Sequence, residues 1–271
     1  MTKKLTVPQL EQLSKKTRIH LLKMIHDAKS GHPGGSLSSV EIMLSLYFNV
    51  MNNDPNDPER DRFVLSKGHS APLFYTVLME AGYIPESADQ LRKYGSILQG
   101  HPDAMKTNGV EISSGSLGNG LSVASGIAAA CKIDGKKNRV FCLMGDGECD
   151  EGLIWEAAMM APHKKLTNLT AIVDRNMLQI DGCTEDVVCL EPFADKWRAF
   201  GWNVIECDGH SFPELLDAFK KAGEPRDQPS VIIAKTTKGK GVSFMENNVG
   251  FHGKAPNDAE LEQALKELGE A

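Results

Sequence analysis

Asp146 and Asn176 each follow a run of apolar residues and can each offer a metal an oxygen ligand. Asp146 lies in a Gly-Asp-Gly tripeptide, and the backbone carbonyl of Leu178 follows Asn176 closely. Mg2+ binds oxygen ligands at roughly 2.1 Å and usually takes one or two protein groups together with substrate phosphates. Gly147 lets backbone N–H groups approach a diphosphate. We therefore predict a metal site at Asp146, Asn176 and the Leu178 carbonyl, beside a diphosphate at Gly147.

The expected secondary structure favours this interpretation. Residues 139–144 and 169–174 predict buried strands, and residues 151–161 predict a helix. Ligands of open α/β sheets bind at the carboxyl ends of strands, and the positive end of a helix attracts anions. An ordinary tight turn with an Asx turn at Asn176 is the alternative. The second strand, which ends beside Asn176, makes that alternative the weaker one.

The histidines divide into two groups by their neighbours. One group lies beside glycine or proline, which predicts exposed loop positions that titrate near neutrality and suit proton transfer: His32, His69, His101 and His252. The other group lies in helical patterns or at a helix start, where a surface or hydrogen-bonded histidine is the simpler interpretation: His20, His26, His163 and His210.

Further segments lie in a characteristic order along the chain. They are Ser30-Gly31-His32-Pro33-Gly34, Ser66-Lys67-Gly68-His69, Gly100-His101-Pro102-Asp103 and the segments 114–120, 238–246 and 252–256. Together with the Gly-Asp-Gly tripeptide they resemble transketolase, a family of thiamine diphosphate enzymes, and specifically its amino-terminal, diphosphate-binding half. The resemblance runs from about Lys15 to Asn257.

The resemblance implies a role for each matched position. The Mg2+ ligands are again Asp146, Asn176 and the Leu178 carbonyl. Gly147 and His69 match positions that contact the diphosphate of thiamine diphosphate. Gly115 and Leu117 match the loop that contacts its aminopyrimidine ring. The residues expected at the sugar and in proton transfer are His32, His101 and His252. Glu151 matches a carboxylate that meets the catalytic glutamate of a partner subunit, and Arg92 matches a position behind the site.

The resemblance also implies a reaction and a partner. Transketolases transfer a two-carbon ketol unit from a ketose phosphate to an aldose, and a glutamate from a pyrimidine-binding domain activates the cofactor. This chain ends soon after residue 256, so we expect a separately encoded partner subunit that carries the pyrimidine and carboxy-terminal domains, in a heterotetramer of two chains of each kind. The alternatives are a component of another thiamine diphosphate enzyme, such as a 2-oxo acid dehydrogenase, or a catalytically silent cofactor-binding chain. The donor and acceptor sugars stay open.

Composition is typical of a soluble, cytoplasmic enzyme subunit. The chain has 271 residues, 41% of them hydrophobic, which suffices for one α/β domain that spans residues 1–271. A formal net charge of −6 argues against nucleic acid, and no apolar run approaches the roughly 18 residues that span a membrane. The six cysteines contain no Cys-x-x-Cys pair and are expected to be free thiols, although a redox or metal role for Cys142 and Cys149 is conceivable.

The pattern of elements predicts an open, mainly parallel sheet with helices on both faces, the thiamine diphosphate-binding fold. The expected strands are Arg62–Leu65, Val140–Met144, Leu169–Asp174, Asn203–Cys207 and Ser230–Lys235. The expected helices are Gln9–Lys29, Ser38–Val50, Ala71–Gly82, Ser87–Tyr94, Gly118–Ile133, Glu151–Ala161, Pro192–Phe200, Pro213–Ala222 and Asp258–Leu268. The helix Gly118–Ile133 suits either a subunit interface or the domain core. The segment 235–241 is either a solvated loop or a flap that touches phosphate.

Overall fold

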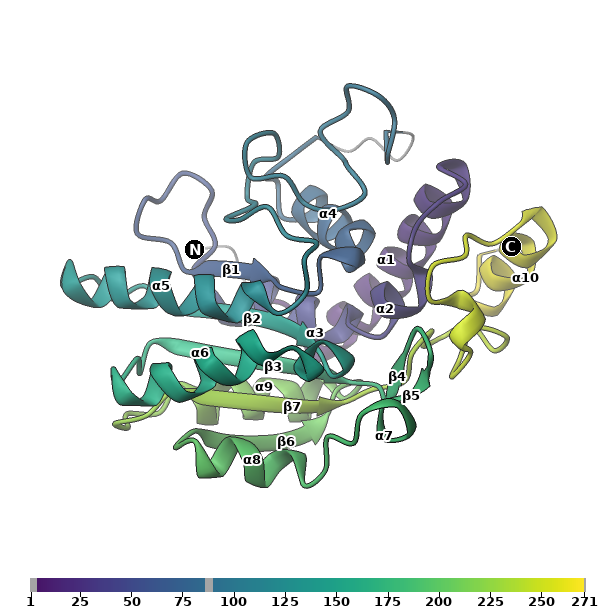
Figure 1. The fold of residues 1–271 in the computed structure, drawn as a ribbon. Helices are drawn as coiled ribbons and strands as arrows, with labels where there is room; N and C mark the ends of the chain where they lie inside the picture. Colours follow the sequence, from purple (N-terminus) through teal and green to yellow (C-terminus); the bar gives the residue numbers. More distant parts are fainter. Residues whose placement is uncertain (1–3, 86–89, 271) are drawn as a thin grey trace.

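A five-stranded parallel sheet forms the centre of the protein in the computed structural model, which describes residues 4–85 and 90–270 (Figure 1). The strands run in the spatial order β1-β2-β3-β7-β6. Their bounds are β1 Arg62–Leu65, β2 Val140–Gly145, β3 Leu169–Arg175, β6 Asn203–Asp208 and β7 Ser230–Lys235. The register aligns Leu143 of β2 with Ile172 of β3, and Ile172 with Ile232 of β7. All neighbouring strands are parallel, so their carboxyl ends meet at one edge.

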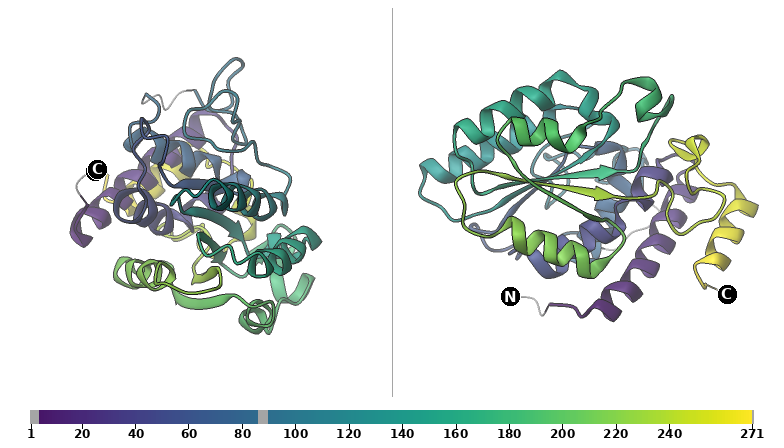
Figure 2. Two further views of the ribbon diagram at one scale, coloured as in Figure 1. Left: turned by 90° about the vertical axis from the view of Figure 1, so that its left-hand side faces the viewer. Right: turned by 90° about the horizontal axis from the view of Figure 1, so that it is seen from below.

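Helices cover both faces of the sheet (Figures 1 and 2). One layer contains α1 (Val7–Asp27), α3 (Val40–Ser45), α4 (Ala71–Glu80) and α9 (Phe212–Ala222). The other contains α5 (Asn119–Ile133), α6 (Gly152–His163) and α8 (Phe193–Ala199). Strand side chains alternate between the two cores: Phe141 and Leu143 pack with the first layer, and Cys142 and Met144 with the second. The predicted fold class is confirmed, and α5 contributes to the second core.

Two of the predicted helices are wrong in part. The range Ser38–Val50 is not one helix, because α2 (Pro33–Leu37), α3 and a π-helical turn (Leu46–Val50) succeed one another. The break lies at Ser38 and Ser39, whose hydroxyls bond Gly35 O and Asp174 in place of continuing the helix. In the range Ser87–Tyr94, residues 90–94 are turns and irregular backbone, with Arg92 at φ 58°, and residues 87–89 lie outside the described part.

Short elements that the sequence pattern did not indicate surround the sheet edge. A 3-10 turn, Gly147–Asp150, separates β2 from α6, so α6 begins at Gly152 and not directly after the glycine tripeptide. A small hairpin of β4 (Leu178–Gln179) and β5 (Gly182–Cys183) follows β3 and leads into α7 (Thr184–Val187). Further 3-10 turns are Gly68–Ser70 and Val249–Phe251, and α10 (Asp258–Glu267) closes the chain against α1.

No helix within the described ranges is long and apolar enough to cross a membrane. The six cysteines are free thiols, as predicted.

Candidate active site

A cavity of about 240 Å³ opens at the carboxyl ends of β2 and β3. Most of the predicted site residues line it: His69, Leu117, Asp146, Gly147, Glu151, Asn176, Leu178 and His252. Three larger cavities in the described part of the chain, of about 360, 470 and 500 Å³, contain none of the predicted site residues. The remaining predicted residues, His32, His101 and Gly115, reach this cavity through contacts with its histidines, described below.

The three predicted metal ligands converge in this cavity. The Asp146 carboxylate accepts hydrogen bonds from Gly147 N (2.9 Å) and Met177 N (2.6 Å), which fix its orientation. Two hydrogen bonds orient the Asn176 side chain. Its Nδ2 donates to Asp174 Oδ2 (3.2 Å), and its Oδ1 accepts from Leu178 N (3.1 Å). A carboxylate, an amide oxygen and a carbonyl match the donor set that Mg2+ takes in proteins. The residues present therefore fit the predicted ion.

No group of three or more acidic, histidine or cysteine side chains in the described ranges is arranged to hold a metal, and the predicted site depends instead on one carboxylate, one amide and one carbonyl. Burial and the nearby Asp174 raise the pKa of Asp146 to about 6, although Met177 N, Arg175 and Gly147 N oppose the shift. A buried carboxylate with a raised pKa is a site where a cation would be stabilising. The electrostatics therefore agree with the donor chemistry.

Gly147 is required by a close approach. A Cβ at this position would lie 2.9 Å from the Cβ of Gln179 in the β4–β5 hairpin. Gly147 begins the 3-10 turn and lines the cavity where the sequence predicts the diphosphate, and its N–H donates to Asp146 Oδ1. The glycine thus brings the backbone close to both the hairpin and the cavity.

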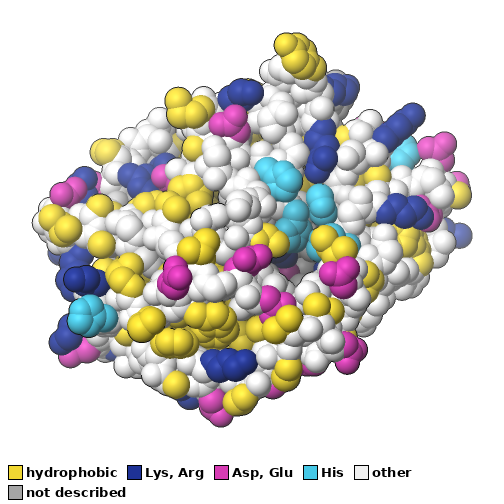
Figure 3. All heavy atoms as spheres, in the orientation of Figure 1, with side chains coloured by type: hydrophobic (Ala, Val, Ile, Leu, Met, Phe, Trp, Pro, Cys, Tyr) yellow, Lys and Arg dark blue, Asp and Glu magenta, His cyan; other side chains and the backbone are white. Residues whose placement is uncertain are grey.

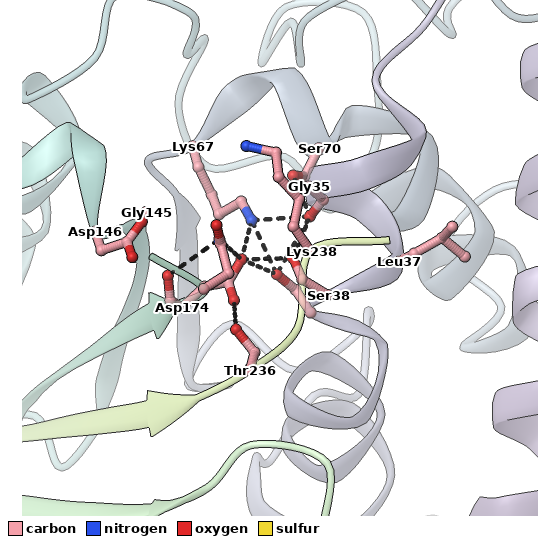
Figure 4. A network of polar contacts seen from close by, with 12 residues as sticks. Gly35, Leu37, Ser38, Lys67, Ser70, Gly145, Asp146, Asp174, Thr236 and Lys238 are labelled. Atoms are coloured by element: carbon pink, nitrogen blue, oxygen red, sulfur yellow. Dashed lines mark hydrogen bonds and ion pairs between the residues drawn. The ribbon is translucent and has the colours of Figure 1, made fainter. Parts of the chain in front are cut away.

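A buried ion pair behind the cavity was missed by the sequence analysis (Figure 4). Lys67 Nζ donates to Asp174 Oδ2, to Gly35 O (2.8 Å) and to Ser39 Oγ (3.0 Å). Asp174 also accepts from Thr236 Oγ1 and Ser38 Oγ (2.6 Å). Burial alone would raise the pKa of Asp174, but Lys67 and these hydrogen bonds lower it to about 2. The network joins the end of β3 to α2, to the segment after β1 and to the segment after β7.

Lys238 brings a second buried ammonium group to the cavity. Its side chain is 2% exposed, and its Nζ donates to the Leu178 carbonyl at 2.9 Å. Among the described residues it forms no ion pair, and burial together with Lys67 lowers its pKa to about 8. Of the two alternatives for the segment 235–241, a solvated loop does not describe Lys238, because its ammonium group is buried at the cavity.

The four loop histidines form one cluster. The His32 ring lies 5.5 Å from that of His69, 5.6 Å from that of His252 and 6.4 Å from that of His101, measured between centroids. His69 and His252 are 5.4 Å apart. Figure 3 shows a group of histidine side chains on this face of the molecule. Segments from four distant parts of the sequence therefore present imidazoles to one place.

The prediction that these histidines are exposed and titrate near neutrality is wrong. His32, His69 and His252 are half-buried, and only His101 is exposed. Burial, followed by the charges of Arg92 and Lys238, lowers the pKa of His32 to about 4. Burial and Lys238 lower that of His252 to about 3, and the pKa values of His69 and His101 are lowered as well. These shifts favour the neutral imidazole, which can accept a hydrogen bond at one ring nitrogen and donate one from the other.

Two ring nitrogens in the cluster are available for a ligand. Nδ1 of His32 and Nδ1 of His252 are buried and have no hydrogen-bond partner among the described residues. Unpaired buried polar atoms are uncommon in folded proteins and indicate an unfilled hydrogen-bonding role. The two unpaired nitrogens thus indicate that the cluster has hydrogen-bonding capacity that the described protein groups do not use.

The predicted ring-binding loop and Glu151 lie on the outer side of the cavity. A Cβ on Gly115 would lie 3.1 Å from the His101 ring, so the loop backbone packs directly on this histidine. Gly118 has φ 87°, and a Cβ there would lie 2.8 Å from Cβ of Glu151. Glu151 is exposed at the start of α6. The loop 115–118 therefore connects the histidine cluster to an exposed carboxylate.

The other four histidines are placed apart from the cluster. His210 is hydrogen-bonded on both ring nitrogens, to Glu41 Oε2 (3.0 Å) and to Thr237 N (2.8 Å), and His26 bonds Asp27 and Asp258. This agrees with the interpretation of hydrogen-bonded histidines outside the site.

Known proteins resemble the chain over almost its whole length. Residues 10–271 match the family described as "Transketolase, thiamine diphosphate binding domain". The chain is 43% identical, over 97% of its length, to one of the subunits of the apulose-4-phosphate transketolase of Phocaeicola vulgatus, of which it covers 95%. It is 45% identical to one of the subunits of the 6-deoxy-6-sulfo-D-fructose transketolase of Clostridium sp., with 88% of each chain covered.

A solved structure shows the same fold. The transketolase of Campylobacter jejuni superposes on 98% of this chain with a TM-score of 0.92 at 32% identity, and this chain spans 43% of its length. The sequence relatives, the solved structure and the residues gathered at the sheet edge agree. The chain belongs to the transketolase family and corresponds to its thiamine diphosphate binding domain.

Proposed function

We propose that the chain is the diphosphate-binding subunit of a two-subunit, Mg2+-dependent transketolase, with residues 1–271 acting as one domain. The observation that carries the proposal is the convergence of three oxygen ligands and four histidines on one cavity edge. Asp146, Asn176 and the Leu178 carbonyl would hold Mg2+. Thiamine diphosphate, when bound, supplies the carbon nucleophile that carries a two-carbon ketol unit.

The cavity brings a buried ammonium group to the expected position of the diphosphate. Lys238 lines it together with His69 and Gly147, and Lys238 donates to the Leu178 carbonyl. An unpaired buried ammonium is costly unless an anion compensates it. We therefore assign Lys238 to the diphosphate, in addition to Gly147 and His69.

The histidine end of the cavity suits sugar hydroxyls. The lowered pKa values of His32, His101 and His252 favour the neutral imidazole, which can orient a hydroxyl by a hydrogen bond. The free Nδ1 atoms of His32 and His252 supply two acceptors or donors, depending on the tautomer. This cluster favours a polyhydroxylated substrate over the simple 2-oxo acid of the alternative enzyme class. We propose a ketose donor and an aldose acceptor carrying phosphate or another anionic group.

The partner would cover the exposed side of the cavity. Both relatives of similar length are named as subunits, so a second chain belongs to those enzymes. Beside the exposed Glu151, apolar side chains of α5 and α6 face outward, with Val123 40%, Leu153 39% and Met159 60% exposed. Figure 3 shows hydrophobic side chains on the same face as the histidine group. We propose that the aminopyrimidine ring, on Gly115 and Leu117, and Glu151 meet the partner there, in a cytoplasmic heterotetramer.

Reconstitution tests the proposal. A candidate partner is a chain that carries a pyrimidine-binding domain with its activating glutamate. We expect no ketol transfer from either chain alone and transfer after mixing with Mg2+ and thiamine diphosphate, followed by mass spectrometry over a panel of ketoses and aldoses. Size-exclusion chromatography with light scattering should give the mass of two chains of each kind. Ketol transfer by this chain alone would show the two-subunit proposal to be wrong.

A further inference from the structure

Glu148 is a buried carboxylate to which the proposed function assigns no role. It is 3% exposed and lies in the 3-10 turn after β2. Its Oε1 accepts hydrogen bonds from the Ser66 hydroxyl and from Gly118 N (2.9 Å), and its Oε2 accepts from Gly145 N (3.1 Å). One side chain thus joins the end of β1, the start of α5 and the end of β2.

Hydrogen bonds are the main compensation for the burial of this carboxylate. No lysine or arginine in the described ranges forms an ion pair with Glu148. A buried carboxylate is stable only when its oxygens are hydrogen-bonded, and such bonds to a charged group are stronger than those between neutral groups. The three donors and the carboxylate therefore fix one another in position.

The loop that Glu148 holds packs against bare backbone. A Cβ on Gly68 would lie 2.8 Å from Gly115 N, and a Cβ on Gly120 would lie 2.2 Å from Ser66 Oγ. Inside the loop the described bonds are few: Ser114 N to Pro102 O at 3.3 Å and Asn119 Nδ2 to Ser116 O at 3.2 Å. Because the loop has few hydrogen bonds of its own, the bond from Gly118 N to Glu148 is one of the few polar contacts that fix its place beside the cavity.

We propose that Glu148 is a positioning residue that sets the loop 115–118 at the distance required by the aminopyrimidine ring of the cofactor. The proposal rests on the proposed function, in which Gly115 and Leu117 contact that ring. Asp146 and Glu148 belong to one turn, so the turn that anchors the metal also anchors the ring-binding loop. Glu148 lines the cavity, but hydrogen bonds to Ser66, Gly118 and Gly145 hold its two carboxylate oxygens, so we assign it the positioning of the loop and no contact with the cofactor.

Two ligands separate this role from a merely structural one. Thiamine diphosphate with Mg2+ uses both the metal site and the loop, whereas inorganic diphosphate with Mg2+ uses the metal site alone. For Glu148→Ala we expect thiamine diphosphate affinity, measured by calorimetry on the assembled enzyme, to fall by about 10- to 100-fold, the scale of a lost hydrogen bond to a buried charged group. Inorganic diphosphate affinity should stay within about threefold. The thiamine diphosphate affinity of Glu148→Gln should lie between those of the wild type and of Glu148→Ala, because the amide oxygen of glutamine can still accept a hydrogen bond but its nitrogen cannot.

Hydrogen exchange reads the loop directly. Amides of residues 114–118 should exchange faster in Glu148→Ala than in the wild type, with the purified chain and without cofactor. Asp61→Asn is the matched control, because Asp61 is also a buried carboxylate, 5% exposed, that accepts hydrogen bonds from backbone N–H groups. Its donors are Asn52 N (2.9 Å) and Arg139 N (2.8 Å), and it lies at the amino ends of β1 and β2, away from the cavity. The substitution should lower stability and leave both affinities unchanged. If Glu148→Ala does not fold, Ser66→Ala is the substitute test, because it removes one donor to Glu148 and leaves the two backbone donors in place. It should lower the affinity for thiamine diphosphate and leave that for inorganic diphosphate unchanged.

The outcomes are distinct. Equal loss of both ligands in Glu148→Ala, or unchanged exchange of residues 114–118, would overturn the positioning role. Unchanged thiamine diphosphate affinity in both Glu148→Gln and Ser66→Ala would overturn it as well. Failure of the wild-type assembly to bind thiamine diphosphate would instead refute the proposed function.

Discussion

Replacing Lys67 by methionine tests whether the ion pair behind the cavity holds the site together. Lys67 is 1% exposed and its partner Asp174 is fully buried. Methionine keeps much of the length of the side chain but has no donor, so Asp174 loses its ammonium partner. Gly35 O still accepts from Ser70 Oγ (2.9 Å), and Ser39 Oγ still donates to Asp174 (3.0 Å). The dominant effect is therefore an uncompensated buried charge.

The size of this effect follows from the burial of the pair. Removing one member of a buried ion pair costs about 3–5 kcal/mol, because the remaining charge stays in a low-dielectric environment. The pKa of Asp174, lowered to about 2 against the effect of burial, keeps this carboxylate charged at neutral pH while Lys67 is present. We expect Lys67→Met to lower the free energy of unfolding by about 3–5 kcal/mol, a large part of the roughly 5–15 kcal/mol of a typical domain. The double variant Lys67→Met/Asp174→Asn should be more stable than Lys67→Met, because no unpaired charge remains.

Urea unfolding measures this difference. The buried Trp197 and Trp202 provide a fluorescence signal from the core, and an unchanged dependence on urea would show that the unfolding transition itself is the same. Lys221→Met is the matched control: the exposed pair with Asp217 (2.7 Å) on α9 should contribute less than about 1 kcal/mol. A loss below about 1 kcal/mol in Lys67→Met, or a double variant less stable than the single one, would refute the reasoning.

Three further predictions follow from the site and its surroundings. Asp146→Ala and Asn176→Ala should each abolish Mg2+-dependent binding of thiamine diphosphate and keep the fold; near wild-type affinity by calorimetry in the assembled enzyme would contradict the metal assignment. Alanine at each of the sugar-facing histidines should leave cofactor affinity within a few fold and lower turnover by roughly 10- to 10⁴-fold. The three variants are His32→Ala, His101→Ala and His252→Ala. Wild-type turnover in all three would rule out the sugar-facing role. Burial would raise the pKa of Glu41, but Arg18 and His210 lower it from 4.5 to about 2, so about 3 kcal/mol of stability is present above pH 4.5 and is lost as the pH falls toward 2. Glu41→Gln should remove this pH dependence from acid unfolding curves, and an unchanged curve would argue against the pair.

The strands were predictable because each is a short, largely apolar run between turn signals; β2, β3 and β7 are almost fully buried, whereas β6 at the sheet edge is mostly half-buried or exposed. Arg62–Leu65 and Ser230–Lys235 have the predicted bounds, and the other strands differ by one residue at their carboxyl ends. The helix predicted over Ser38–Val50 failed for a tertiary reason. Ser38 and Ser39 bond a carboxylate that is 136 and 135 residues away in sequence, and no local pattern contains that information.

The part of the candidate site that could be predicted is the part whose residues directly follow the strands of the sheet. Gly-Asp-Gly and Asn176 follow adjacent parallel strands, so their convergence follows from the sheet. The pairing of Lys67 with Asp174 was missed, although both are next to motif residues, because the pair is 107 residues apart and its burial is visible only after folding. Glu148 was missed for the same reason: its three donors come from three separate segments.

The protonation state of the histidines was the main error about the site, and its cause is collective. Each histidine taken with its sequence neighbours is an ordinary loop residue with an ordinary pKa. In the fold, burial removes water from three of the rings, and Arg92, Lys67 and Lys238 place positive charge around them. Both effects disfavour the imidazolium form, so the cluster is kept neutral by residues that do not belong to any histidine motif. A neutral imidazole can accept a hydrogen bond from a sugar hydroxyl at one ring nitrogen and donate one from the other, whereas an imidazolium could only donate. Lys238, which suits the diphosphate, thus also helps to keep His32, His69 and His252 in the neutral form that can accept such bonds.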